Sequence, residues 1–229
     1  MLWVILIGFM ILGWAVSSQL KSRFKKYSKT LISSGLSGRE IAERMLNDHG
    51  IYDVDVISVP GKLTDHYNPA KKTVNLSPDV FNGRHVAAAA VAAHECGHAV
   101  QHAKAYSWLS LRSKLVPMVN VSSQIMNFVF IVGMLGAFAF SMFPFEWVIM
   151  VIIASQAVIT AFTLVTLPVE YDASNRALAW LKTSGLSTGQ EMNQAQDALK
   201  WAARTYLVAA LAALTQLAYW VMVLMGSRD

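Results

Sequence analysis

Four long apolar runs dominate the pattern of hydrophobic and polar positions along the chain. They cover residues 2–16, 115–143, 145–167 and 205–226, and Glu146 is the one acidic or basic residue inside them. A helix needs about 20 residues to cross the hydrocarbon core of a bilayer, so the runs predict four membrane-spanning helices, the first of them short. Because channels and transporters usually carry charges or broken helices near the midplane, this pattern argues against a transport function.

The basic residues predict how the spans are oriented. Of the 19 Lys and Arg residues, 18 lie in residues 17–114 and 168–204, which four spans place on one side of the membrane. The positive-inside rule makes that side the cytoplasm and leaves both termini outside. The basic cluster follows the first run instead of preceding it, which indicates an uncleaved anchor and not a signal peptide. The expected organisation is an anchor (1–18), a cytoplasmic region (19–114), a membrane hairpin (115–167), a second cytoplasmic segment (168–204) and a last span (205–229).

Composition supports a membrane protein. Hydrophobic residues make up 55% of the chain and charged residues 14%, against about 25% charged in a typical soluble domain. The net charge of +5 follows from the two basic segments, so we expect contact with the lipid bilayer and not with nucleic acid. The single cysteine, Cys96, excludes an internal disulfide.

The first hydrophilic segment predicts a small α+β region within an otherwise α-helical membrane protein. Ser37 and Glu40 form a capping-box pattern that begins a helix over residues 38–49. Residues 54–61 and 71–77 read as strands, and Pro78 begins a short helix. A longer, alanine-rich helix is expected over residues 84–106.

The stretch HECGH lies on that alanine-rich helix. His94 and His98 are four residues apart and therefore share one face, where both imidazoles can bind one metal ion. Glu95 is offset by one residue, so it can reach a metal-bound water instead of the metal. This H-E-x-x-H arrangement is used for metal-assisted peptide hydrolysis, whereas histidines merely exposed on a helix are the competing interpretation. We expect Cys96 to point away from the metal.

A catalytic zinc needs a third protein ligand and an open position. Glu170, in LPVEYDASNRALAW just after the third run, lies at the same predicted membrane face. His102 is two turns from His94, about 12 Å along a straight helix, so it is expected outside the ligand set or in solvent. The other histidines that could serve are His49, His66 and His85.

The motif HECGH, the segment PVEYDASNRA and the long stretch DHYNPAKKTVNLSPDVFNGRHVAAAAVAAHECGHAVQ resemble the YugP-type family of bacterial membrane proteins regarded as neutral zinc metallopeptidases. The resemblance extends over nearly the whole chain. More distantly, the chain is similar to the HtpX and CAAX-protease group of membrane gluzincins, which have an aspartate four residues after the ligating glutamate. Here that position is Ser174, so the group that orients a zinc histidine is open between Asp172 and Asn175.

The resemblance implies a zincin-like metallopeptidase in the bacterial cytoplasmic membrane, acting on protein or peptide substrates at the cytoplasmic side. One Zn²⁺ would be held by His94, His98 and Glu170, with Glu95 as general base. The strand at 71–77 could bind substrate as an added strand. Candidates for the donor that stabilises the oxyanion are His66, Tyr67 and Arg176.

Two alternatives stay open. A site-2-type intramembrane protease shares H-E-x-x-H but takes its third ligand from an L-D-G segment, which this sequence lacks. A non-catalytic zinc-binding scaffold or adaptor is the other, although Glu95 would have no use in it.

Overall fold

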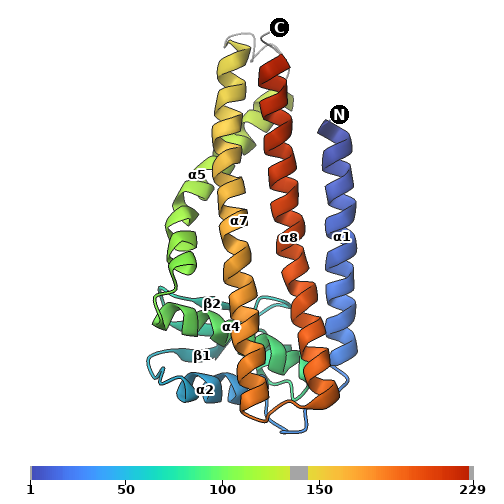
Figure 1. The fold of residues 1–229 in the computed structure, drawn as a ribbon, viewed down its shortest axis with the longest axis vertical. Coiled ribbons are helices and arrows are strands. Elements are labelled where there is room, and N and C mark those ends of the chain that lie inside the picture. The colour runs from blue at the N-terminus through green and yellow to red at the C-terminus, as the bar shows by residue number, and fades with distance from the viewer. Residues whose placement is uncertain (1, 135–143, 227–229) are drawn as a thin grey trace. The chain divides into compact units, whose positions relative to one another are not determined.

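The computed structural model describes residues 2–134 and 144–226. The end of the predicted second span, residues 135–143, lies outside the described residues. The helices and strands are α1 (Leu2–Tyr27), α2 (Gly38–Asp48), β1 (Asp55–Ser58), β2 (His66–Asn68), β3 (Thr73–Leu76), α3 (Pro78–Phe81), α4 (Val86–Ala103), α5 (Ser107–Met134), α7 (Phe145–Thr183) and α8 (Gly189–Gly226), coloured along the chain in Figure 1.

The chain forms two compact units, and each is described by itself. The apolar unit comprises residues 1–14, 110–167 and 206–229. The sheet-containing unit comprises residues 15–109 and 168–205. The four long helices α1, α5, α7 and α8 each contribute residues to both units.

In the described chain, four helices are long and apolar enough to cross a membrane: α1, α5, α7 and α8. Large apolar side chains of the apolar unit are exposed, as with Trp3 (69%), Phe128 (67%) and Trp147 (65%), which suits a lipid surrounding. Within this unit, buried Gln156 donates from Nε2 to the carbonyl oxygen of Ala213 over 3.2 Å. Such polar contacts between apolar helices hold them together where the hydrophobic effect gives little preference.

The long helices extend further than the apolar pattern predicted. Helix α7 continues from its apolar part through Pro168 to Thr183 and so carries Glu170 on the same helix, not on a separate one. Helix α8 begins at Gly189 and α1 continues to Tyr27. Hydropathy marks only the part of a helix suited to lipid, whereas backbone hydrogen bonding carries the helix on into polar sequence.

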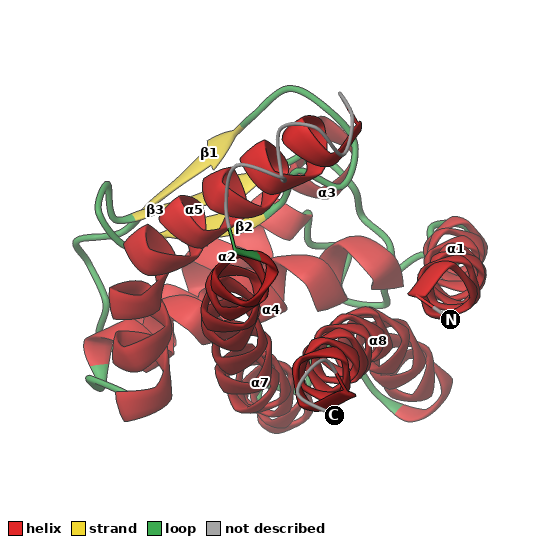
Figure 2. Ribbon diagram, turned by 90° about the horizontal axis from the view of Figure 1, so that it is seen from above, coloured by secondary structure: helices red, strands yellow, loops and turns green. Residues whose placement is uncertain are grey.

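A three-stranded sheet lies in the sheet-containing unit, in the order β1-β3-β2 (Figure 2). Strand β3 pairs in parallel with β1 and antiparallel with β2, and Val74 of β3 faces Val56 and Tyr67. The expectation that this strand binds substrate by strand addition is therefore wrong, because both of its edges are already paired. Strand β2, which the sequence pattern did not predict, is an edge strand.

Helix α4 forms the centre of this unit, and α2 packs against it. The predicted capping box is confirmed: the Ser37 amide donates to Glu40 Oε2 (2.7 Å) and the Glu40 amide donates to Ser37 Oγ (3.3 Å). Ile41 and Met45 of α2 are fully buried. Alanines 87–90, 92 and 93 of α4 are 0–1% exposed, so the alanine run serves close packing.

Helices α4 and α7 approach closely at Gly97. A Cβ atom built there would lie 2.5 Å from the carbonyl oxygen of Ala173, so a glycine is needed for the two backbones to lie this near. This contact is one turn from His94 and Glu170 and sets the distance between their helices.

Candidate metal centre

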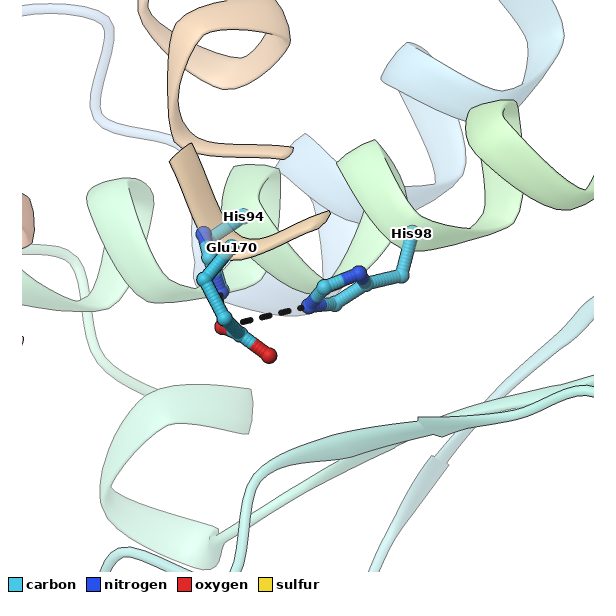
Figure 3. A group of neighbouring side chains, drawn as sticks. All are labelled: His94, His98 and Glu170. Carbon is cyan, nitrogen blue, oxygen red and sulfur yellow. Dashed lines mark ion pairs between the residues drawn. The ribbon is translucent and has the colours of Figure 1, made fainter. Parts of the chain in front are cut away.

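His94 and His98 of α4 and Glu170 of α7 point toward one another in the sheet-containing unit (Figure 3). One ligand atom from each lies within 4.8 Å of the other two. The Nε2 atoms of His94 and His98 are 3.3 and 3.7 Å from Glu170 Oε2. The side chains of His94, His98 and Glu170 are 12%, 9% and 3% exposed, respectively. No other group in residues 2–134 and 144–226 offers three metal-ligating side chains this close together.

These distances suit a tetrahedral metal ion. Bonds of about 2.0–2.1 Å to nitrogen and oxygen place neighbouring ligand atoms roughly 3.3–3.4 Å apart, close to the 3.3 and 3.7 Å between Glu170 Oε2 and the two Nε2 atoms. Two imidazole nitrogens and one carboxylate oxygen are a donor set that zinc accepts, with a fourth position free for water. The residues present therefore fit a catalytic zinc ion.

Both histidines are oriented by a partner at Nδ1. Ser174 Oγ lies 3.2 Å from His94 Nδ1, and Gln101 Oε1 lies 3.0 Å from His98 Nδ1. With Nδ1 engaged, each ring presents its Nε2 atom to Glu170. In metal-binding histidines, the ring nitrogen that does not bind the metal usually has a hydrogen-bond partner of this kind. Neither partner was predicted from the sequence. The available signals were the position of Ser174, four residues after Glu170, and the three-residue interval between His98 and Gln101 on one helix.

Asp172 and Asn175 were the two residues expected to orient a zinc histidine, and they lie in different surroundings. Asp172 Oδ2 accepts hydrogen bonds from Gln101 Nε2 (2.8 Å) and Arg176 Nε (2.5 Å), so it reaches His98 only through Gln101. Asn175 lies on an exposed part of α7. Arg176 is held by Asp172, and its guanidinium lies 5.7 Å from the Tyr106 ring centre.

Glu95 is buried beside the three ligands, with 8% of its surface exposed. Burial raises the pKa of its carboxyl, and the neighbouring His94 and His98 partly offset that effect. Among the described residues, Glu95 makes no hydrogen bond or ion pair, so its carboxylate is available to a substrate or water. The pKa of His98 would be lowered by burial, but the hydrogen bond and charge of Glu170 outweigh this and raise it.

Cys96 lies on the side of α4 that faces α2. Its thiol donates to the carbonyl oxygen of Ala42 over 3.6 Å, and burial raises its pKa well above the usual value.

Tyr67 of β2 and His102, near the end of α4, form a pair. Tyr67 Oη, on β2, lies 2.7 Å from His102 Nδ1, and burial, with the charge of Asp53, raises the pKa of Tyr67 to about 12. His102 is not among the three residues whose ligand atoms cluster in the described chain. His66 is exposed and its Nδ1 lies 2.8 Å from the Thr64 carbonyl oxygen.

The remaining histidines serve helix ends. His85 Nδ1 accepts from the Ala88 amide (3.0 Å) at the start of α4, and His49 Nδ1 bonds to the Met45 carbonyl oxygen (2.8 Å) at the end of α2.

Comparisons with known proteins agree with this donor set. A family model described as "Putative neutral zinc metallopeptidase" matches residues 2–225. The chain is similar to the "Putative membrane protease YugP" of Bacillus subtilis (strain 168), with 42% identity over 216 residues that cover 94% of this chain and 92% of that protein. No solved structure matches the chain.

Proposed function

The chain belongs to the family described as neutral zinc metallopeptidases, and we propose that it is an endopeptidase that cleaves proteins at the cytoplasmic face of a bacterial membrane. The observation that carries the proposal is the convergence of His94, His98 and Glu170 with both Nε2 atoms facing one carboxylate oxygen. Zinc held there would supply a Lewis acid for the scissile carbonyl and lower the pKa of a bound water.

Glu95 is the proposed general base. Glu95 directly follows His94 on α4 and therefore points in a different direction around the helix. Its carboxylate lies beside the three proposed ligands and is not one of them. It would take a proton from the attacking water and give it to the leaving amine. Burial, which raises its pKa, makes the carboxylate a stronger base than an exposed glutamate.

Strand β2 is the proposed guide for the substrate. Its Tyr67 bonds to His102, one turn after His98 on α4, so the strand lies beside the ligating helix. An extended peptide could add to its outer edge through backbone hydrogen bonds. The oxyanion candidates Arg176, His66 and Tyr67 are engaged by Asp172, Thr64 and His102, respectively. We favour Tyr67, because its phenol oxygen can accept from His102 and keep its own O–H to donate.

The alternatives remain a zinc-binding scaffold without activity and a site-2-type protease. The glutamate third ligand argues against the site-2 type, which uses an aspartate. The Glu95 carboxylate is buried without a hydrogen-bond partner among the described residues, and burying such a group costs stability. Metal binding alone does not require this carboxylate, so its presence favours catalysis over a scaffold.

Incubating the purified full chain with casein tests the proposal. Wild-type protein should cleave casein and lose this activity with a zinc chelator. Glu95→Gln should keep its zinc but lose cleavage by at least about 100-fold. Glu43→Gln, which changes an exposed carboxylate on α2, is the matched control and should cleave normally. Full cleavage by Glu95→Gln, or cleavage insensitive to the chelator, contradicts the proposal.

A further inference from the structure

We infer that Gln101 is a positioning residue that fixes the tautomer of His98 and joins this ligand to the backbone next to Glu170. The inference rests on the proposed metal site. Gln101 is fully buried, at 0% exposed, and its amide has three polar neighbours. Its Nε2 lies 2.8 Å from both the Val169 carbonyl oxygen and Asp172 Oδ2, and its Oε1 lies 3.0 Å from His98 Nδ1.

The orientation of this amide follows from its neighbours. A primary amide has two N–H donors on nitrogen, and its oxygen can only accept. The Val169 carbonyl oxygen and the Asp172 carboxylate, which is paired with Arg176, also only accept. If the amide were rotated by 180°, its oxygen would face both acceptors. The Val169 carbonyl oxygen and the Asp172 carboxylate would then lose the donor that they have in Gln101. Both N–H groups of Gln101 are therefore used, and Oε1 must face His98.

The tautomer of His98 follows in turn. Because Gln101 Oε1 can only accept, His98 Nδ1 must carry the hydrogen. A neutral imidazole protonated at Nδ1 has its lone pair on Nε2, the nitrogen that faces Glu170 Oε2 at 3.7 Å. Gln101 thus fixes a hydrogen of His98 on Nδ1 and leaves Nε2 as the nitrogen that would bind a metal.

The same amide spans two helices. Val169 directly precedes Glu170, so the hydrogen bond from Gln101 on α4 holds the backbone of α7 next to the third ligand. Asp172, which also accepts a hydrogen bond from Arg176, accepts from the second N–H of the Gln101 amide. His94 lacks such a constraint, because the Ser174 hydroxyl can either donate or accept. The two histidines are therefore preorganised to different degrees.

Zinc affinity of the full-length protein in detergent, measured by competition with a chromophoric chelator, tests this inference. Gln101→Met keeps the length of the side chain and removes all three hydrogen bonds. Losing a partner that orients a metal ligand typically weakens metal binding about 10–100-fold, and we expect that loss here, with an altered visible spectrum of bound Co²⁺. Gln156→Met is the matched control. It removes a buried glutamine that bonds to a backbone carbonyl within the apolar unit and should leave zinc affinity and the Co²⁺ spectrum unchanged.

A rescue pair separates positioning from general damage to the fold. Gln101→Glu keeps an acceptor for His98 but sets a carboxylate against Asp172, so zinc binding should weaken. Adding Asp172→Asn supplies an N–H donor toward residue 101 and should recover most of the lost affinity.

Equal zinc affinity in Gln101→Met and Gln156→Met would overturn the inference while leaving the proposed function intact. If Gln101→Met does not fold, failure of Asp172→Asn to improve Gln101→Glu overturns it. A wild-type chain that binds no zinc contradicts the proposed function, and this inference with it.

Discussion

Ser174 of α7 places a hydroxyl next to His94, one of the three clustered residues. The hydroxyl oxygen lies 3.2 Å from His94 Nδ1, so a hydroxyl and not a carboxylate is the partner of this nitrogen. A neutral hydroxyl holds an imidazole less firmly than a carboxylate does, because charge-assisted hydrogen bonds are about twice as strong.

Exchanging this residue should change zinc affinity in both directions. Ser174→Ala removes the partner of His94 and should weaken zinc binding, by less than Gln101→Met does because the hydroxyl fixes no tautomer. Ser174→Asp supplies a carboxylate for Nδ1–H and should bind zinc at least as tightly as wild type. Chelator competition on the three proteins measures this, and weaker binding by Ser174→Asp than by Ser174→Ala would contradict it.

At this scale, the sequence predicted what depends on local spacing. The four-residue interval places His94 and His98 on one face of a helix, and the offset of Glu95 follows from the same geometry. Local spacing allowed the contact between His98 and Gln101, which lie three residues apart on α4. The contacts of Gln101 with Asp172 and of Ser174 with His94 join residues 71 and 80 positions apart, and no local pattern shows which turn of α7 will face α4.

Among the elements, the contact between α4 and α7 decides whether a metal site can form. Gly97→Ala should separate the two helices, since its Cβ would lie 2.5 Å from the Ala173 carbonyl oxygen, which is backbone and cannot turn aside. Overpacking of this kind typically costs about 1–3 kcal/mol. We expect a lower unfolding temperature and weaker zinc binding.

Thermal unfolding in detergent and chelator competition measure these effects. Gly13→Ala is the control, because a Cβ there meets nothing within 4 Å, and it should be neutral or slightly stabilising. A Gly97→Ala variant with wild-type stability and zinc affinity would mean that the helices are not in this close contact.

The elements also show where sequence patterns lose information. The capping box at Ser37 and the proline at position 78 define the starts of α2 and α3, because capping depends on neighbouring residues only. Strand β2 is three residues of polar sequence, and its pairing with β3 gives it structure that its own composition does not indicate. The continuation of α7 past Pro168 was not predicted, because hydropathy falls after this residue although the helix continues to Thr183.

At the scale of the whole molecule, hydropathy alone predicted the four helices that can cross a membrane. Their orientation stays a prediction and can be tested by cysteine labelling. Cys96 is buried at 0% exposure and has a raised pKa, so it should react little with maleimides in the folded protein. Wild-type protein therefore gives a low background.

Cysteines introduced at Lys62 and Lys182, one in each hydrophilic segment, should resist a membrane-impermeant maleimide in intact cells and react after permeabilisation. A cysteine at Glu146, in the first turn of α7, is expected on the opposite side and should react in intact cells. Labelling of Lys62→Cys and Lys182→Cys on different sides would contradict the arrangement of four spans.

The central claim is that two histidines of α4 and one glutamate of α7 bind a single metal ion. Zinc content per chain, measured by mass spectrometry of metals on purified wild type and Glu170→Gln, tests it most directly, with Glu43→Gln as the control for an exposed carboxylate. One zinc per chain is expected in wild type and control, and a small fraction of that in Glu170→Gln. An undiminished zinc content in Glu170→Gln would show that the third ligand lies elsewhere.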